Sequence, residues 1–548
     1  MTSGSPTRYP LSTPPAAAAG WRLDRISPPS RVFGANGLRT GPDGRVYIAQ
    51  VTGSQISALD IHTGAVTAIS PKGGDIVAPD DVAFDPAGRL IATEVMNGRV
   101  SILENGVARV VRDDLPSANG ITVHQGRLFI GECRPGGRLW ELDADGGPSR
   151  LIAENLPSPN AMEFGPDGLL YFPVMEANEI WRLDPDGDGI PQRVAGDLGV
   201  PDSVKFDAQG FIVSTQVYSG QVLRIDPRTG EQRVLAQLSP GLDNCTFVDG
   251  RLFVSNFTGE ITEINADGST RAALPGGLNW PLDLAVAEDG TLWVADGTFT
   301  YTMSDTGEMS ATGESPGTGE REIAGMMFTP GYPGFLRGLA PAGPGRFLVT
   351  TANGEVGYWH PGPSETEVLA DGFDQLYGVA AGPGDSVLAV EQGTGRLLGI
   401  RGGQTEVLAT GLHTPVGVAV GADGAVLVSE SGAGRVVRVR GGATETVADG
   451  LDCPHGLLIR GGRVYVVDAG AKAVLEIDPE TGTTRTIAAG LPVGAPAGVT
   501  PKPLLGMPPF SGPQGPFAGI AAGADGTLYV SADADGSVLA LRREVPAS

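Results

Sequence analysis

Six polar residues recur at one position of a repeated sequence pattern in the first half of the chain. Each stands directly before a short apolar run, and each carries a side-chain oxygen. Carboxylate and amide oxygens are the ligands that hard divalent cations such as Ca²⁺ prefer. If the repeats surround a common axis, these side chains converge on it. The six residues are Asn36, Asp80, Asn119, Asn160, Asp202 and Asn244.

We predict a divalent metal site at this position. Ca²⁺ is the first choice, with Mg²⁺, Mn²⁺ and Zn²⁺ as alternatives, and the absence of His and Cys disfavours zinc. The alternative is that Asn and Asp occur here because they suit turns. The matching position of the second half has no Asn or Asp, which favours the metal. The predicted ligands are Asn36, Asp80, Asn160, Asp202 and Asn244, and Asn119 is assigned to substrate binding.

The matching position of the second half carries a different set of side chains. Arg337 suits a carboxylate or a phosphate, which a guanidinium can bind through two parallel hydrogen bonds. His455 is followed by Asp468 on the next expected strand, near the same end, and His with a carboxylate is a common acid/base pair. The six residues are Leu282, Arg337, Tyr377, Val416, His455 and Ala518.

Acidic residues end the second strand of several repeats in this half. We predict His455 as a catalytic residue of the second half, with Arg337 and Tyr377 binding substrate. Glu391, Glu430 and Asp468 complete that predicted substrate site. The alternative is that strand-end acids bind turns, because Glu94 and Glu132 occupy the same position in the first half.

The repeats that carry these residues predict the fold. Twelve copies of an apolar run, a turn and a second apolar run follow one another at a period near forty residues, which is typical of a β-propeller. Each copy reads as four strands with alternating apolar residues, as in 416–420, 425–429, 435–440 and 444–448. Because propellers hold about four to eight blades, we predict an all-β chain of two tandem six-bladed propellers.

The predicted domains follow from counting strands. Residues 1–20 are expected to be a disordered tail, 21–268 the first propeller and 269–548 the second. We expect residues 21–26 to complete the sixth blade and residues 270–274 to complete the twelfth. Two longer spacings predict apolar insertions near 312–336 and 491–517, before the first strand of a blade. They would form a pocket lid over the second propeller, or else a contact surface.

Composition limits the classes of partner. The net charge is −25, from 38 basic and 63 acidic residues without a basic cluster, which disfavours nucleic acid. No apolar stretch approaches the length of a membrane span. Three cysteines form no disulfide framework, so we expect a cytoplasmic protein acting on a small molecule. The oligomeric state is left open.

Two stretches of the first half resemble the regucalcin/gluconolactonase family. They begin at Ser158-Pro159-Asn160-Ala161 and at Pro201-Asp202-Ser203-Val204. The resemblance implies a six-bladed propeller with one divalent metal in its channel, held in part by Asn160 and Asp202. It also implies Asp202 as the catalytic base. The family has a Glu where this chain has Asn36.

The phrase Pro454-His455-Gly456, with Asp468 after it, is similar to virginiamycin B lyase, a propeller enzyme that opens a cyclic depsipeptide by elimination. That family has Glu where this chain has Asp468, and it has seven blades.

These patterns lead to one expected function and two alternatives. We expect a metal-dependent enzyme acting on a small or medium, partly apolar metabolite, as a lactonase-like hydrolase or a related cyclase. One alternative is a C–O lyase that uses His455. The other is a non-catalytic scaffold with a structural metal.

Overall fold

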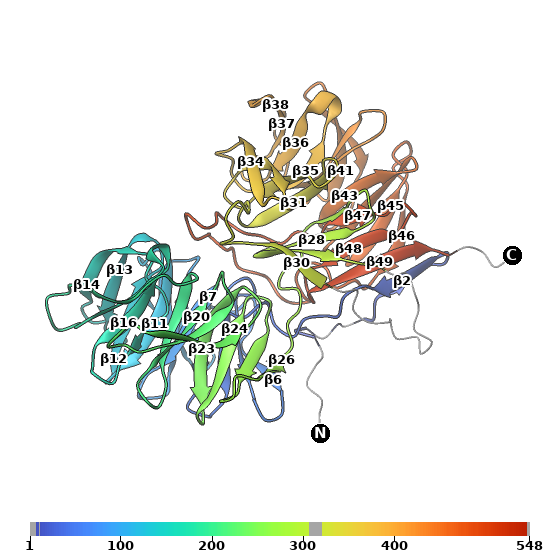
Figure 1. Cartoon of the computed structure of the whole chain (residues 1–548). Coiled ribbons are helices and arrows are strands. Elements are labelled where there is room, and N and C mark those ends of the chain that lie inside the picture. Colours follow the sequence, from blue (N-terminus) through green and yellow to red (C-terminus); the bar gives the residue numbers. More distant parts are fainter. Residues whose placement is uncertain (1–6, 10, 12, 306–320, 545–548) are drawn as a thin grey trace. The chain divides into compact units, whose positions relative to one another are not determined.

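The computed structural model describes residues 7–9, 11, 13–305 and 321–544 (Figure 1). These residues form twelve antiparallel sheets, eleven of four strands and one of five. The chain divides into two compact units. The first contains Arg31–Asn279 and Pro501–Pro509, and the second contains Thr7–Ser30, Trp280–Thr500 and the residues from Phe510 onward. No described helix is long and apolar enough to cross a membrane.

The first unit holds six four-stranded blades and the short 3₁₀ helix η1 (Met175–Ala177). In blade order the strands are β3 (Leu38–Thr40), β4 (Val46–Gln50), β5 (Gln55–Leu59), β6 (Val66–Ser70); β7 (Pro79–Phe84), β8 (Leu90–Glu94), β9 (Arg99–Glu104), β10 (Val107–Arg112); β11 (Ala118–His124), β12 (Arg127–Glu132), β13 (Pro135–Leu142), β14 (Arg150–Pro157); β15 (Glu163–Phe164), β16 (Leu170–Val174), β17 (Glu179–Leu183), β18 (Gln192–Ala195); β19 (Pro201–Phe206), β20 (Ile212–Gln216), β21 (Gln221–Ile225), β22 (Gln232–Gln237); β23 (Leu242–Val248), β24 (Arg251–Asn256), β25 (Ile261–Ile264) and β26 (Thr270–Leu274).

The second unit holds the other six blades and η2 (Pro383–Asp385). Its strands are β27 (Leu284–Val286), β28 (Leu292–Asp296), β29 (Phe299–Met303), β30 (Arg321–Met326); β31 (Leu336–Pro341), β32 (Phe347–Thr351), β33 (Val356–His360), β34 (Glu365–Ala370); β35 (Leu376–Ala381), β36 (Val387–Glu391), β37 (Arg396–Arg401), β38 (Gln404–Ala409); β39 (Pro415–Val420), β40 (Val426–Glu430), β41 (Arg435–Arg440), β42 (Ala443–Ala448); β43 (Pro454–Arg460), β44 (Arg463–Asp468), β45 (Ala473–Ile477), β46 (Thr484–Ala489) with β1 (Ala16–Ala17); and β47 (Ile520–Ala522), β48 (Leu528–Ala532), β49 (Ser537–Arg543) with β2 (Trp21–Arg25).

The inner strands of each unit form a closed ring. In the first unit, contacts run in order through β3, β7, β11, β15, β19 and β23, and β23 returns to β3. In the second unit they run through β27, β31, β35, β39, β43 and β47, and β47 returns to β27. Each unit is therefore a six-bladed propeller, as the repeat predicts.

Apolar side chains between neighbouring blades make up the core. Phe129 of β12 and Phe172 of β16, for example, are buried in one cluster from two adjacent blades. At the axis the inner strands approach closely, so that a Cβ on Gly37 would lie 2.5 Å from the carbonyl oxygen of Asp80. The absence of a side chain at Gly37 permits this approach.

The strands that close the two propellers are the reverse of those predicted. The strand β2 pairs with β49 and completes the last blade of the second propeller, where Figure 1 shows it in blue against the red strand. The strand β26 pairs with β25 and completes the sixth blade of the first propeller. The division predicted at residue 268 therefore separates β26 from its own blade.

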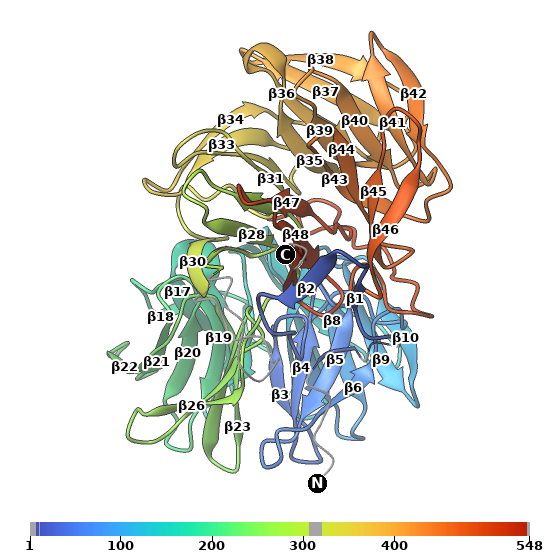
Figure 2. The ribbon, with the colours of Figure 1, turned by 90° about the vertical axis from the view of Figure 1, so that its right-hand side faces the viewer.

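The N-terminal tail and the insertions also differ from expectation. Ala16 and Ala17 form β1, which pairs with β46 (Figure 2), so this part of the predicted disordered tail is ordered. The segment 312–336 is not one loop, because β30 forms the outer strand of its blade within it; residues 306–320 lie outside the described residues. The insertion 491–517 does precede β47, but Pro501–Pro509 belongs to the first unit.

Candidate functional site

Each inner strand of the first propeller has one polar residue at its start or just before it. The register of β7 shows how: Pro79 pairs with Glu94 and Val82 pairs with Ala92, so two residues stand opposite one. Such a bulge interrupts the alternation of side chains. The equivalent residues of the six blades, called the oxygen ring below, are Asn36, Asp80, Asn119, Asn160, Asp202 and Asp243.

The sixth member of the oxygen ring is Asp243, whereas the sequence predicted Asn244. Leu242 begins its blade as Pro79 begins the second blade, since each pairs with the last residue of the next strand. The residue after each, Asp243 or Asp80, is therefore equivalent. The side chain of Asn244 is used locally.

The oxygen of Asn244 accepts a backbone hydrogen bond instead of joining the oxygen ring. Its Oδ1 accepts the N–H of Cys245 at 2.8 Å. Asp81, the residue after Asp80, does the same for the N–H of Val82 at 2.8 Å. The turn-forming role proposed as the alternative for Asn and Asp thus applies to this neighbouring position.

Two pairs of oxygen-ring side chains bind each other. Asn160 Nδ2 donates to Asp202 Oδ2 at 3.1 Å, and Asn36 Nδ2 donates to Asp243 Oδ2 at 3.1 Å. The other atom of the Asn160 amide, Oδ1, is buried and has no hydrogen-bond partner. A buried acceptor without a partner is costly and points to a missing ligand.

Burial and mutual repulsion perturb the three carboxyl groups of the oxygen ring. Burial, followed by the charge of Asp81, raises the pKa of Asp80 to about 7. Burial and the charge of Asp80 raise the pKa of Asp202 well above its usual value. Burial and the charge of Asp202 do the same for the pKa of Asp243. A cation among these groups would favour their charged forms.

A second layer of charged residues, which sequence reasoning missed, lies three residues further along the inner strands. Arg39 donates to Glu163 Oε2 at 2.9 Å, and Lys205 Nζ lies 3.5 Å from the same oxygen. Burial and the neighbouring Arg39 lower the pKa of Lys205. The carboxyl group of Asp81 also interacts with both cations, so this layer contains two basic and two acidic side chains. The available signal was a basic residue, Arg39 or Lys205, within an inner strand of a propeller.

The donor set of the oxygen ring fits a hard divalent cation in its chemistry. Five of its six residues are buried, Asn36 is half-buried, and Asn160 Oδ1 lacks a partner. Among the described residues, no three His, Cys, Asp or Glu side chains are arranged to hold a metal ion. A cation would therefore depend on the asparagine oxygens as well as on the carboxylates.

The residues predicted at the mouth of the second propeller do begin its inner strands. Arg337, Tyr377 and His455 are all buried. The guanidinium carbon of Arg337 lies 4.0 Å from the centre of the Tyr377 ring, and the ring of Phe517 lies 6.0 Å from that of Tyr377. Phe517 also stacks on His455, with ring centres 6.1 Å apart.

His455 and Asp468 do not form the predicted acid/base pair. His455 Nδ1 accepts the N–H of Ala518 at 3.1 Å, and its Nε2 lies 3.5 Å from Cys453 Sγ. The Asp468 carboxylate accepts backbone N–H groups, among them that of Cys453 at 2.9 Å. Burial lowers the pKa of His455 to about 4, so its imidazole is neutral near pH 7.

We predict that His455 makes the second propeller sensitive to acid. The unfolded imidazole takes up a proton near pH 6.5, and the folded one only near pH 4. Between these values the unfolded state binds more protons. The free energy of unfolding therefore decreases by up to about 3 kcal/mol as the pH is lowered from 6.5 to 4. Of its neighbours, Asp468 opposes this shift and Lys472 adds to it.

Denaturant unfolding of the wild type and His455→Gln between pH 7 and pH 4 measures this effect. Gln retains an acceptor for the Ala518 N–H but does not titrate, so the variant should lose less stability on acidification. An equal loss in both proteins would contradict the prediction.

Glu391 and Glu430 have the structural role considered as the alternative. The carboxylate of Glu391 accepts the N–H of Asp374 at 2.9 Å and pairs with Arg396. Glu430 likewise accepts the N–H of His413 at 2.6 Å and pairs with an arginine of the next strand. These acids fix the loop before each blade.

Comparison with known families matches residues 21–258 to the family described as SMP-30/Gluconolactonase/LRE-like region. The match covers most of the first propeller and, in the second, only the segment that contains β2. No curated protein matches the chain.

Several solved structures are similar to about half of the chain. Virginiamycin B lyase from Staphylococcus aureus is 17% identical, with a TM-score of 0.37, over 50% of this chain and 96% of that one. A gluconolactonase from Xanthomonas campestris is 19% identical, with a TM-score of 0.37, over 46% and 96%. Regucalcin, a calcium-binding protein from Agrobacterium tumefaciens, is 19% identical, with a TM-score of 0.35, over 41% and 82%.

Proposed function

We propose that the first propeller is a metal-dependent hydrolase of lactones or related esters, since most of it lies within residues 21–258, which match a family whose description includes gluconolactonase. The substrate would be a small or medium, partly apolar metabolite. The observation that carries the proposal is the buried pair Asn160 and Asp202 beside two further carboxyl groups.

The oxygen ring would hold the cation through Asn160, Asp202 and Asp243, with Asn36 and Asp80 completing the set. Calcium is the expected ion, since every donor is an oxygen. Bound there, a divalent cation would polarise the substrate carbonyl and make a nearby water more acidic.

Asp202 is the proposed general base. Asn160 Nδ2 donates to Asp202 Oδ2, which orients the carboxylate, and no hydrogen bond within the described chain occupies its Oδ1. The base would take a proton from water as the water oxygen bonds to the carbonyl carbon. The ring C–O bond then breaks, and the proton passes to the departing alkoxide. Asn119, which is also buried at this position, would contact the substrate.

Two other functions remain as alternatives with different requirements. A related cyclase would use the same oxygen ring, and a scaffold would use its metal only for stability. A lyase based on His455 is less well supported, because Asp468 does not contact the imidazole and Glu391 and Glu430 are bonded to loops.

Metal removal tests the proposal. We expect EDTA treatment followed by exchange into metal-free buffer to abolish hydrolysis of a panel of five- and six-membered lactones. Adding back Ca²⁺, Mg²⁺, Mn²⁺ or Zn²⁺ singly should restore it, with Ca²⁺ most effective. The melting temperature is measured in the same samples. A melting temperature that depends on metal, with no lactone hydrolysis in any sample, would favour the non-catalytic scaffold and overturn the proposed hydrolase.

We further propose a cytoplasmic protein with a small-molecule substrate and no nucleic-acid partner. The free thiols of Cys133, Cys245 and Cys453 and the acidic composition support this proposal.

A further inference from the structure

Arg337, at the start of β31, is a buried cation that has no carboxylate partner among the described residues. The residue is 1% exposed, and among the described residues no carboxylate lies within ion-pair distance of its guanidinium. Its Nη1 donates to Gln514 Oε1 at 2.9 Å, and its plane lies over the Tyr377 ring. Burying a charge is costly unless hydrogen bonds or an opposite charge compensate it.

The two unused donors of Arg337 are the ones that bind an oxyanion. Both Nε and Nη2 are buried and have no hydrogen-bond partner. These two N–H groups point the same way from the planar guanidinium and match the two oxygens of a carboxylate or phosphate. No other described arginine has both of these atoms buried and without a partner.

Gln514 adds a third unused donor next to Arg337. Its Oε1 accepts from the guanidinium, and its Nε2 is buried without a partner. The Gln514 amide is therefore bonded through its acceptor only. Arg337 and Gln514 therefore present three N–H donor atoms, Nε and Nη2 of Arg337 and Nε2 of Gln514, that have no acceptor.

The surroundings supply no negative charge to this cluster. None of the six residues that begin the inner strands of the second propeller is acidic. The carboxyl group of Asp283, in the neighbouring blade, accepts the N–H of Leu284 at 2.9 Å and of Leu339 at 2.9 Å. Burial raises the pKa of Asp283 to about 7, which reduces its charge further.

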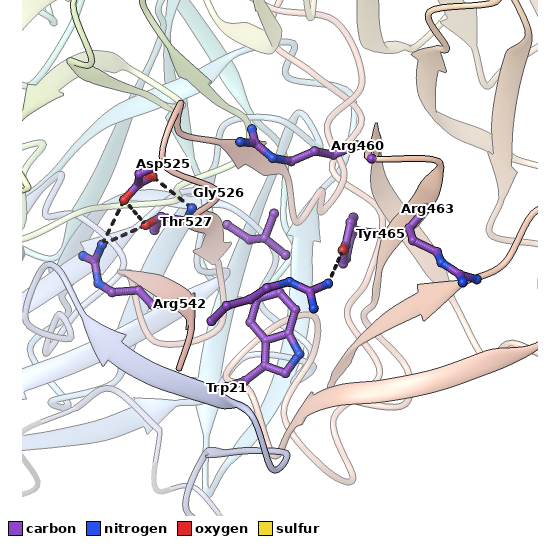
Figure 3. A pocket seen from close by; sticks show the side chains of 11 residues that line it. Trp21, Arg460, Arg463, Tyr465, Asp525, Gly526, Thr527 and Arg542 are labelled. Carbon is purple, nitrogen blue, oxygen red and sulfur yellow. Dashed lines mark hydrogen bonds and ion pairs between the residues drawn. The ribbon is translucent and has the colours of Figure 1, made fainter. Parts of the chain in front are cut away.

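Four other arginines of the second propeller have hydrogen-bond acceptors. They line a pocket of about 410 Å³, together with Trp21 and Tyr465 (Figure 3). Each guanidinium in this pocket already donates to an acceptor of the protein. The acceptors are the Gly523 carbonyl for Arg460, Asp478 for Arg463, Asp24 for Arg542 and Glu476 for Arg543.

We propose that Arg337 and Gln514 form an oxyanion-binding site in the second propeller, separate from the oxygen ring of the first. The ligand is a small molecule that presents a carboxylate or phosphate group. Two of its oxygens bind Nε and Nη2 of Arg337, and the amide Nε2 of Gln514 donates a third hydrogen bond. The ring of Tyr377 holds the guanidinium plane in place.

Titration of the full-length protein with simple anions tests the site. Sodium acetate and inorganic phosphate are each compared with sodium chloride at equal ionic strength, by calorimetry and by thermal unfolding. We expect saturable binding of at least one of the two anions and a rise in the melting temperature of the second propeller. Acetate alone would identify the group as a carboxylate, and phosphate alone as a phosphate.

Variants connect the binding to these residues. Arg337→Lys retains the charge but loses the paired donors, so we expect at least tenfold weaker binding. Arg440→Lys, at an exposed strand end, is the matched control and should bind as the wild type does. Gln514→Glu places a carboxylate against Arg337 and should raise the melting temperature without anion while removing the anion effect.

Two results would overturn the proposal. One is the absence of saturable binding of both anions to the wild type. The other is unchanged affinity in Arg337→Lys, which would place the anion elsewhere on the protein.

Discussion

Trp21→Ala is expected to lower the free energy of unfolding of the second propeller by about 3–5 kcal/mol and to leave the first propeller unchanged. Trp21 is 5% exposed and belongs to the core cluster of the last two blades. Its ring packs edge-on against Tyr465, with ring centres 6.3 Å apart, and beneath the guanidinium of Arg543. Truncation leaves a cavity in the blade that β2 completes.

Leu274→Ala in β26 is the matched variant for the first propeller. Leu274 is fully buried in a cluster with residues such as Ile48, so its loss should cost about 2–5 kcal/mol in that unit. Hydrogen–deuterium exchange of peptides from β19 and from β39 shows which propeller each variant loosens. Faster exchange in β19 of Trp21→Ala, or in β39 of Leu274→Ala, would contradict the assignment of β2 to the second propeller and of β26 to the first.

Asp202→Asn is expected to reduce kcat for lactone hydrolysis by about 10²–10⁴-fold. Asn has nearly the same shape but cannot accept a proton from water. The fold should persist, because the substitution removes a buried carboxyl group whose pKa is raised by burial. Circular dichroism and the melting temperature check the fold. Full turnover in a folded Asp202→Asn protein would exclude Asp202 as the base.

Asp243→Asn and Asn244→Ser separate the oxygen ring from its neighbour in sequence. Asp243→Asn should weaken Ca²⁺ binding, measured by calorimetry, because the site loses a charge. Asn244→Ser keeps an acceptor for the Cys245 N–H and should leave Ca²⁺ affinity within about twofold. If Asn244→Ser weakened Ca²⁺ binding and Asp243→Asn did not, Asn244 rather than Asp243 would be the ligand.

The repeat predicted the propellers but not the strands that close them. Outer strands such as β2 and β26 are short and carry no residue that marks a particular blade, so composition does not assign them to one. Chain connectivity does distinguish them. The strand β26 follows its partner β25 after a short turn and pairs with it locally at low entropic cost. Because β26 pairs with β25, β2 remains as the strand that can pair with β49.

One residue of the oxygen ring was missed because the repeats were aligned on their small residue. In the sixth blade Cys245 was taken for that residue, although Asn244 occupies the position. Alignment on the aromatic residue of the inner strand would have avoided the shift, since Phe84, Phe206 and Phe247 are equivalent in β7, β19 and β23. The other five residues of the ring lie at the strand position that the spacing indicated.

Pairing of side chains across strands was the least predictable feature. His455 and Asp468 lie on neighbouring strands, but the Asp468 carboxylate accepts hydrogen bonds from backbone N–H groups of the preceding loop. Sequence spacing places residues on strands and does not show which loop amide competes for a side chain. The unused edge of Arg337 likewise becomes visible only when its contacts are known.

The pairing of β2 with β49 sets an order of events during synthesis. Nearly all of the first propeller lies between Arg31 and Asn279, so it can form while the ribosome makes the second half. The strand β2 is synthesised before the first propeller but has no partner until Ser537–Arg543 follows about 520 residues later. At about 5–20 residues per second, that delay is roughly 25–100 s. During this time β2 is an open strand that chaperones or other chains can bind.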